Sequence, residues 1–176
     1  KEIGICFGLI DDIVKVNDLI VEVLKVFDCD KIFLRPHPRD DRNSLINDLI
    51  SKHKIQLSDS KKVDSSSFLS NVQCIISSES NIHLEATIQN VYSLYFNLTE
   101  SNRQKFDVYG FISNKLISDF SDKANLLKML LKLKNKKPNV REKARYYNAT
   151  IGTKYEGKSY FLYNEVISFI KNNDIN

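Results

Sequence analysis

Short apolar runs alternate with amphipathic helical patterns along most of this chain. The runs are rich in Ile, Val and Phe, which is typical of buried β-strands. Between the runs, apolar residues recur three and four positions apart, as they do on the inner face of a helix. Strands are predicted at 2–8, 31–35, 55–57, 72–76 and 91–96. Helices are predicted at 11–27, 40–53, 65–71, 81–90, 121–134, 140–150 and 159–172.

This alternation constrains the topology. A strand, a helix and a second strand in succession fold as a right-handed βαβ unit, and several such units build a parallel sheet with helices on both faces. We therefore expect residues 1–176 to form one Rossmann-like, three-layer α/β domain around a central parallel sheet of about five or six strands. Ligands of such sheets bind beyond the carboxyl ends of the strands. The loops to examine follow Phe7, Leu34, Leu57, Ile76 and Phe96.

The composition is that of an ordinary globular protein, with 42% hydrophobic and 27% charged residues. No apolar stretch approaches the ~20 residues of a membrane-spanning helix. Cys6, Cys29 and Cys74 have no pairing pattern, and Cys6 and Cys74 fall in predicted strands. We expect buried free thiols there, and hence a reducing compartment and a cytoplasmic location.

Lysines gather late in the chain, at Lys132, Lys134, Lys136 and Lys137, within a net charge of +4. They fit a solvated helix end, where cations complement the helix dipole. The alternative is a peripheral contact with an anionic membrane surface. Nucleic acid is not expected as a partner, because no basic stripe carries interleaved aromatic residues.

The sharpest signal follows the second predicted strand, where the chain reads RPHPRD from Arg35 to Asp40. Two prolines restrict the backbone around His37. An imidazole held at the carboxyl end of a strand can donate a hydrogen bond to a phosphate oxygen, and when protonated it can offset charge on a departing phosphate. Arg35 and Arg39 flank His37 and could hold the same anion. The alternative is that the proline pair only ends the strand.

The loop after the fourth predicted strand is also polar, with Ser77, Ser78, Glu79 and Ser80 leading into a helix. Hydroxyls and free backbone N–H groups at a helix start can bind an anion. Capping of the helix by Ser80 is the alternative. Both polar loops should open on one edge of the sheet, so we predict a phosphate site shared between them.

Glu85 lies one turn into the next predicted helix, where a carboxylate could accept hydrogen bonds from both ribose hydroxyls. A solvent-facing helix residue is the alternative. His83 beside it is more typical of a surface or packing histidine. The sequence has no Gly-rich phosphate loop, no nucleophile elbow and no metal-ligand spacing, so neither a metal nor an organic cofactor is predicted.

Taken in order, these segments resemble the C-terminal, donor-binding half of GT-B glycosyltransferases of bacterial capsule and surface-polysaccharide synthesis. The shared pattern is a strand ending in His-Pro, a strand ending in Ser-Ser or Ser-x-Ser, and a helix with Glu-Ala. Here it reads HP at 37–38, SSES at 77–80 and EA at 85–86. The groups it resembles include polysialyltransferase-like and lipooligosaccharide sialyltransferase-like enzymes, which use CMP-sugars, and CDP-glycerol glycerophosphotransferases.

The resemblance implies a CMP- or CDP-activated donor, metal-independent transfer, and a saccharide acceptor held by an N-terminal domain. His37 would contact the donor phosphate and assist departure of the leaving group, and Glu85 would sit near the ribose. The residues expected to bind nucleotide and phosphate are Arg35, Pro36, His37, Ser77, Ser78, Ser80 and Glu85. The chain opens inside a predicted strand and its one Met is Met129. We therefore expect a donor-binding fragment, inactive without its acceptor half.

Two other interpretations stay open. UDP-sugar 2-epimerases share the two-domain architecture and a His-Pro loop. A phosphoacceptor receiver module would use Asp11, Asp12 and Asp59 beyond predicted strands, together with a Ser from the 77–78 pair. That family also has a Lys-Pro pair, whereas Lys115 here is followed by leucine.

Overall fold

A six-stranded parallel sheet forms the centre of the protein in a computed structural model, which describes residues 2–99, 107–120, 122–133, 138–156 and 158–172. The strands are β1 (Glu2–Phe7), β2 (Ile32–Pro36), β3 (Gln56–Leu57), β4 (Val72–Ser77), β5 (Tyr92–Phe96) and β6 (Ser118–Phe120). Every neighbouring pair is parallel. The predicted Rossmann-like α/β fold with a central parallel sheet is confirmed.

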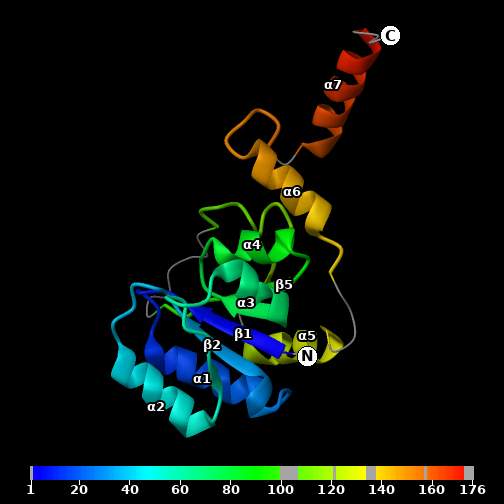
Figure 1. The fold of residues 1–176 in the computed structure, drawn as a ribbon. Helices are drawn as coiled ribbons and strands as arrows, with labels where there is room; N and C mark the ends of the chain where they lie inside the picture. Colours follow the sequence, from blue (N-terminus) through cyan, green and yellow to red (C-terminus); the bar gives the residue numbers. More distant parts are fainter. Residues whose placement is uncertain (1, 100–106, 121, 134–137, 157, 173–176) are drawn as a thin grey trace.

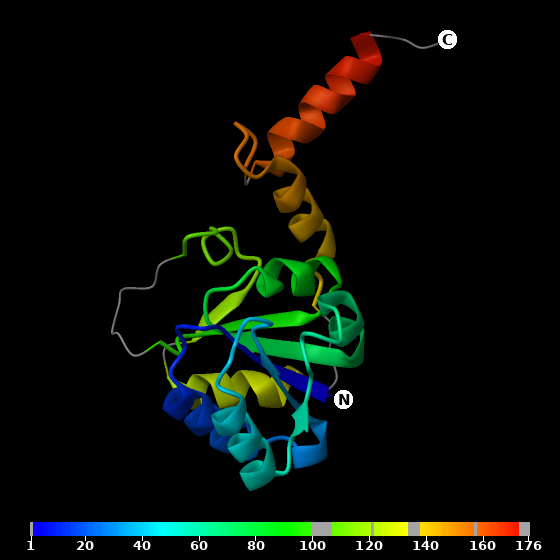
Figure 2. The ribbon, with the colours of Figure 1, turned by 60° about the vertical axis from the view of Figure 1, so that its left-hand side comes forward.

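Helices cover both faces of this sheet (Figure 1). One face carries α1 (Ile13–Val23), α2 (Asn43–His53) and α5 (Lys123–Leu133). The other carries α3 (Ser65–Asn71) and α4 (Ile82–Ile88), and α6 (Arg141–Thr150) packs against α4. A 3-10 turn, η1 (Cys29–Lys31), precedes β2. The last helix, α7 (Ser159–Asn172), extends away from the sheet (Figure 2).

The alternation of side chains along β1 builds both layers of the core. Ile3 and Ile5 are fully buried toward α1, and Cys6 faces α3. Gly4 is required by the close approach of α3, since a Cβ there would lie 2.5 Å from the Phe68 ring. Side chains on both faces of β1 are thus covered by helices. A strand buried in this way has a continuous apolar sequence, which is the pattern that predicted it.

Aspartate side chains cap the N-termini of α1 and α3. Asp12 accepts a hydrogen bond from the Val14 N–H at 2.8 Å, so α1 starts two residues later than predicted. Asp64 caps α3 in the same way, with the Ser67 N–H at 2.9 Å. The strand β6 was not predicted.

The predicted buried thiols are present: Cys6 and Cys74 are free and buried. Burial raises the pKa of both, that of Cys6 to about 12. Of the late lysines, Lys132 is exposed near the end of α5, whereas Lys134, Lys136 and Lys137 lie outside the described residues. Within the described ranges, no helix is long and apolar enough to cross a membrane.

The strand order β3-β2-β1-β4-β5-β6 reverses direction between β1 and β4. It is the order of dinucleotide-binding Rossmann folds, whereas receiver domains have the flavodoxin-like order 2-1-3-4-5. The receiver interpretation is therefore wrong on topology. In open α/β sheets the ligand crevice lies at such a reversal, beyond the strands' carboxyl ends.

Candidate functional site

A cavity of about 460 Å³ opens at this reversal point. Its walls come from the carboxyl ends of β1, β2 and β4 and from the loops beside them. The lining residues are 6–8, 35–38, 60, 64–65, 77, 79–82, 85 and 109. The two polar loops expected to share an anion thus contribute to one cavity.

His37 lines this cavity and is half-buried. Its backbone N–H donates to the Phe7 carbonyl at 2.9 Å, which carries the β1–β2 pairing one residue past Pro36. The backbone N–H of Arg39 donates to Nδ1 of His37 at 3.1 Å. Because Nδ1 accepts, the neutral imidazole carries its proton on Nε2. Nε2 is therefore the ring atom able to donate to a ligand.

Arg35 is buried behind the same loop. Its guanidinium donates to Ser58 Oγ at 3.0 Å and to the Val63 carbonyl at 2.9 Å, and it lies 4.8 Å from the centre of the Phe68 ring. It forms no ion pair with any residue that the structure describes. Arg35 therefore brings a buried positive charge to the cavity, which the carboxylates of Asp64, Glu79 and Glu85 also line. Arg39, in contrast, is exposed and does not line the cavity.

Two of the three predicted serines line the cavity. Ser77 is the last residue of β4 and is almost fully buried. Ser80 Oγ accepts a hydrogen bond from the Ile82 N–H, the first N–H of α4, at 3.4 Å, although the N-cap residue of this helix is Asn81. A hydroxyl that accepts in a cap still keeps its own proton, so Ser80 remains able to donate to a ligand.

Ser78 has a different place. It is not among the lining residues, and its Oγ lies 2.7 Å from both carboxylate oxygens of Asp11. Asp11 is buried and also accepts the Gly8 N–H at 2.6 Å. Burial raises the pKa of the Asp11 carboxyl, while the hydrogen bonds from Gly8 and Ser78 oppose that shift. The Ser78 side chain thus ties the β4 loop to the β1 loop.

His83 supports the same loop from behind. Its Nε2 donates to the Ser78 carbonyl at 2.8 Å, and its Nδ1 accepts from Ser93 Oγ at 2.6 Å. The carbonyl can only accept, which fixes the tautomer. Burial lowers the pKa of His83 to about 4, so the ring is neutral near pH 7. His83 is a packing histidine that holds the β4–α4 loop in position.

Three acidic residues line the cavity: Asp64, which caps α3, together with Glu79 and Glu85. Glu79 Oε1 accepts the Val108 N–H at 2.6 Å and so joins the β4 loop to the segment after β5. Glu85 is half-buried on α4, and its carboxylate has no hydrogen-bond partner among the residues described. Its predicted contact with ribose hydroxyls stays a prediction.

Several lining residues were not predicted as site residues, among them Ser60, Asp64, Ser65 and Tyr109. The first three lie in or just after the loop that follows Leu57, which was one of the loops to examine but in which no nucleotide-binding residue was predicted. Its position after β3, at the same sheet edge, was the signal that could have found them. The Tyr109 ring stacks on the Phe111 ring, with 5.2 Å between the ring centres. Tyr109 lies in a segment with no strand or helix pattern.

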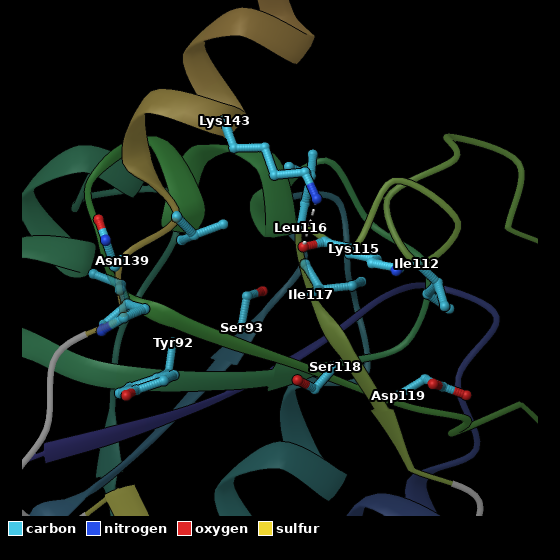
Figure 3. A pocket seen from close by; sticks show the side chains of 13 residues that line it. Tyr92, Ser93, Ile112, Lys115, Leu116, Ile117, Ser118, Asp119, Asn139 and Lys143 are labelled. Carbon is cyan, nitrogen blue, oxygen red and sulfur yellow. Dashed lines mark hydrogen bonds between the residues drawn. The ribbon is translucent and has the colours of Figure 1, made fainter. Parts of the chain in front are cut away.

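A larger cavity, of about 590 Å³, lies at the opposite edge of the sheet (Figure 3). It is bounded by the first residues of β5 and β6 and by the start of α6. Ligands of open parallel sheets bind at the carboxyl edge. The residues predicted to bind phosphate, including His37 and Ser77, line the cavity of about 460 Å³ at the carboxyl edge and not this one.

No family model matches the chain, and no curated protein matches its sequence. Solved structures are similar in fold. One is the wall teichoic acid polymerase TagF soaked with CDPG, with a TM-score of 0.51 and 14% identity over 99% of this chain. A second TagF structure, obtained after a longer soak, has a TM-score of 0.50 and 16% identity over 100% of this chain. The β-Kdo 2,4 transferase KpsC of Thermosulfurimonas dismutans has a TM-score of 0.44 and 11% identity over 82% of this chain.

These likenesses concern the fold alone, because the identities are low. The chain spans 43% and 44% of the length of the two TagF structures and 51% of KpsC. It therefore corresponds to less than half of TagF.

Proposed function

We propose that this domain binds the nucleotide end of a CMP- or CDP-activated donor and forms the donor half of a glycosyltransferase of bacterial surface-polysaccharide synthesis. The observation that carries the proposal is the cavity at the reversal point, which His37, Ser77 and the buried Arg35 all line. The fold shared with TagF, whose structure was soaked with CDPG, supports it.

The phosphate attached to the sugar would lie between His37 and Ser77. As the glycosidic bond breaks, negative charge grows on that phosphate, so a hydrogen-bond donor placed there stabilises the transition state more than the ground state. His37 would donate a hydrogen bond to that phosphate from Nε2. In this scheme the side chains perform the neutralisation without a metal.

Glu85 would accept hydrogen bonds from the ribose hydroxyls, since its carboxylate lines the same cavity. The acceptor and the catalytic base would belong to an N-terminal domain, in keeping with the share of TagF that this chain spans. The domain would act in the cytoplasm, where Cys6, Cys29 and Cys74 stay reduced. Lys132 would contribute to a peripheral contact with the inner membrane face.

Calorimetric titration with CDP, UDP, ADP and GDP tests the ligand class. We expect CDP to bind most tightly, and Glu85→Gln to weaken all four nucleotides through their common ribose. A preference for UDP would favour the epimerase interpretation instead. Absence of binding by every nucleotide would contradict the proposal.

Turnover of the two-domain protein tests the role of His37. His37→Ala should lower kcat by roughly 10²–10³ and change donor affinity far less. His53→Ala is the matched control, because His53 lies at the end of α2 and its Nε2 contacts Asn17 Oδ1 at 2.9 Å. If His37→Ala stays within a few-fold of wild type, the proline-flanked histidine only ends β2.

A further inference from the structure

The larger cavity exists because β6 is short. β5 begins at Tyr92, but the register pairs Leu94 with Ser118, the first residue of β6. Tyr92 and Ser93 therefore have no β6 neighbour within the described sheet, which leaves a notch at its edge. The start of α6 closes this notch from above in Figure 3.

Two lysines, Lys115 and Lys143, line this cavity. Lys143 reaches down from the first turn of α6, and its Nζ donates to the Lys115 carbonyl at 3.4 Å (Figure 3). Burial and the nearby charge of Lys115 both lower the pKa of Lys143. An anion bound in the cavity between these two side chains would offset both positive charges. Asp119 lines the cavity from β6 (Figure 3).

The rest of the lining indicates what the anion is attached to. The volume of about 590 Å³ is in the range of small-molecule sites and exceeds the need of a simple ion. Tyr92, Ser118 and Asn139 also line the cavity, and their hydroxyl and amide groups are of the kind that bind ligand hydroxyls. Ile112 and Ile117 offer apolar wall for C–H groups.

We propose that this second cavity binds a phosphorylated or carboxylated sugar, with its anionic group at Lys115 and Lys143. The site is on the opposite sheet edge from His37 and is built from other elements. It is therefore independent of the proposed donor function, and either can fail without the other.

Amide NMR titration of the ¹⁵N-labelled chain tests the site, with glucose 1-phosphate, inorganic phosphate and glucose as probes. We expect glucose 1-phosphate to shift the Lys115, Ser118 and Lys143 signals to saturation. Inorganic phosphate should shift them more weakly, because it lacks the hydroxyl contacts. Glucose should leave them unchanged, because it lacks the anion.

Lys143→Met keeps the aliphatic chain and removes the charge. It should raise the dissociation constant of glucose 1-phosphate by about tenfold, the effect of losing one charged hydrogen bond. Lys25→Met is the matched control, since it changes the net charge equally from the exposed end of the α1 segment. Shifts that are absent, that gather at His37 and Ser77, or that survive Lys143→Met unchanged overturn the proposal. If glucose 1-phosphate and inorganic phosphate bind with equal affinity, the cavity does not recognise a sugar, and that part of the proposal is wrong.

Discussion

Protonation of His83 should destabilise the fold as the pH falls. The pKa of this buried ring is lowered from 6.5 to about 4, mainly by burial. The unfolded chain therefore takes up a proton before the folded protein does. The stability supplied by neutral His83 is complete above pH 6.5 and is lost progressively as the pH falls from 6.5 toward 4. The loss attributable to His83 is about 2 kcal/mol between pH 7 and pH 5, and about 3 kcal/mol in total.

Urea unfolding followed by circular dichroism at pH 7, 6 and 5 measures this loss. His83→Gln should be less stable than wild type at pH 7, because it disturbs the bonds to Ser78 and Ser93. Its stability should nevertheless fall by about 2 kcal/mol less between pH 7 and pH 5. His37→Gln, which leaves the buried contacts of His83 intact, should follow the wild type. Equal losses in wild type and His83→Gln would refute the reasoning.

Two further changes test packing around the sheet. Gly4→Ala places a Cβ 2.5 Å from the Phe68 ring and should reduce the free energy of unfolding by ~1–3 kcal/mol in urea titrations. Gly8→Ala meets only a 3.6 Å contact and should change it by less than about 0.5 kcal/mol, so equal effects at both positions would contradict this packing. Arg42→Lys loses the fork that joins Asp40 to the Gly8 and Asp11 carbonyls. Calorimetry should show that Tm is lowered by about 4 °C or more. An unchanged Tm would show that these Arg42 hydrogen bonds do not stabilise the fold.

The sheet could be predicted from sequence wherever hydrophobic pattern alone decides structure. The apolar runs of β1, β2, β4 and β5 are buried on both faces, so they stand out from the amphipathic helices between them. β6 could not be found in this way. Its residues Ser118, Asp119 and Phe120 form no apolar run, and they become a strand only by pairing with β5.

The candidate site could be predicted in position but not in every contact. The carboxyl-edge rule brought His37, Ser77, Ser80 and Glu85 to one cavity. The rule says nothing of which way adjacent side chains turn. Ser78 contacts Asp11, which is distant in sequence, so no local pattern indicates that contact.

The most direct test of the central claim is an amide NMR titration of this chain with CDP, which reports where the nucleotide binds. The account predicts saturable shifts at Gly8, His37, Ser77 and Glu85, around the cavity between β1, β2 and β4. Shifts concentrated at Lys115 and Lys143, or no shifts at saturating CDP, would contradict it.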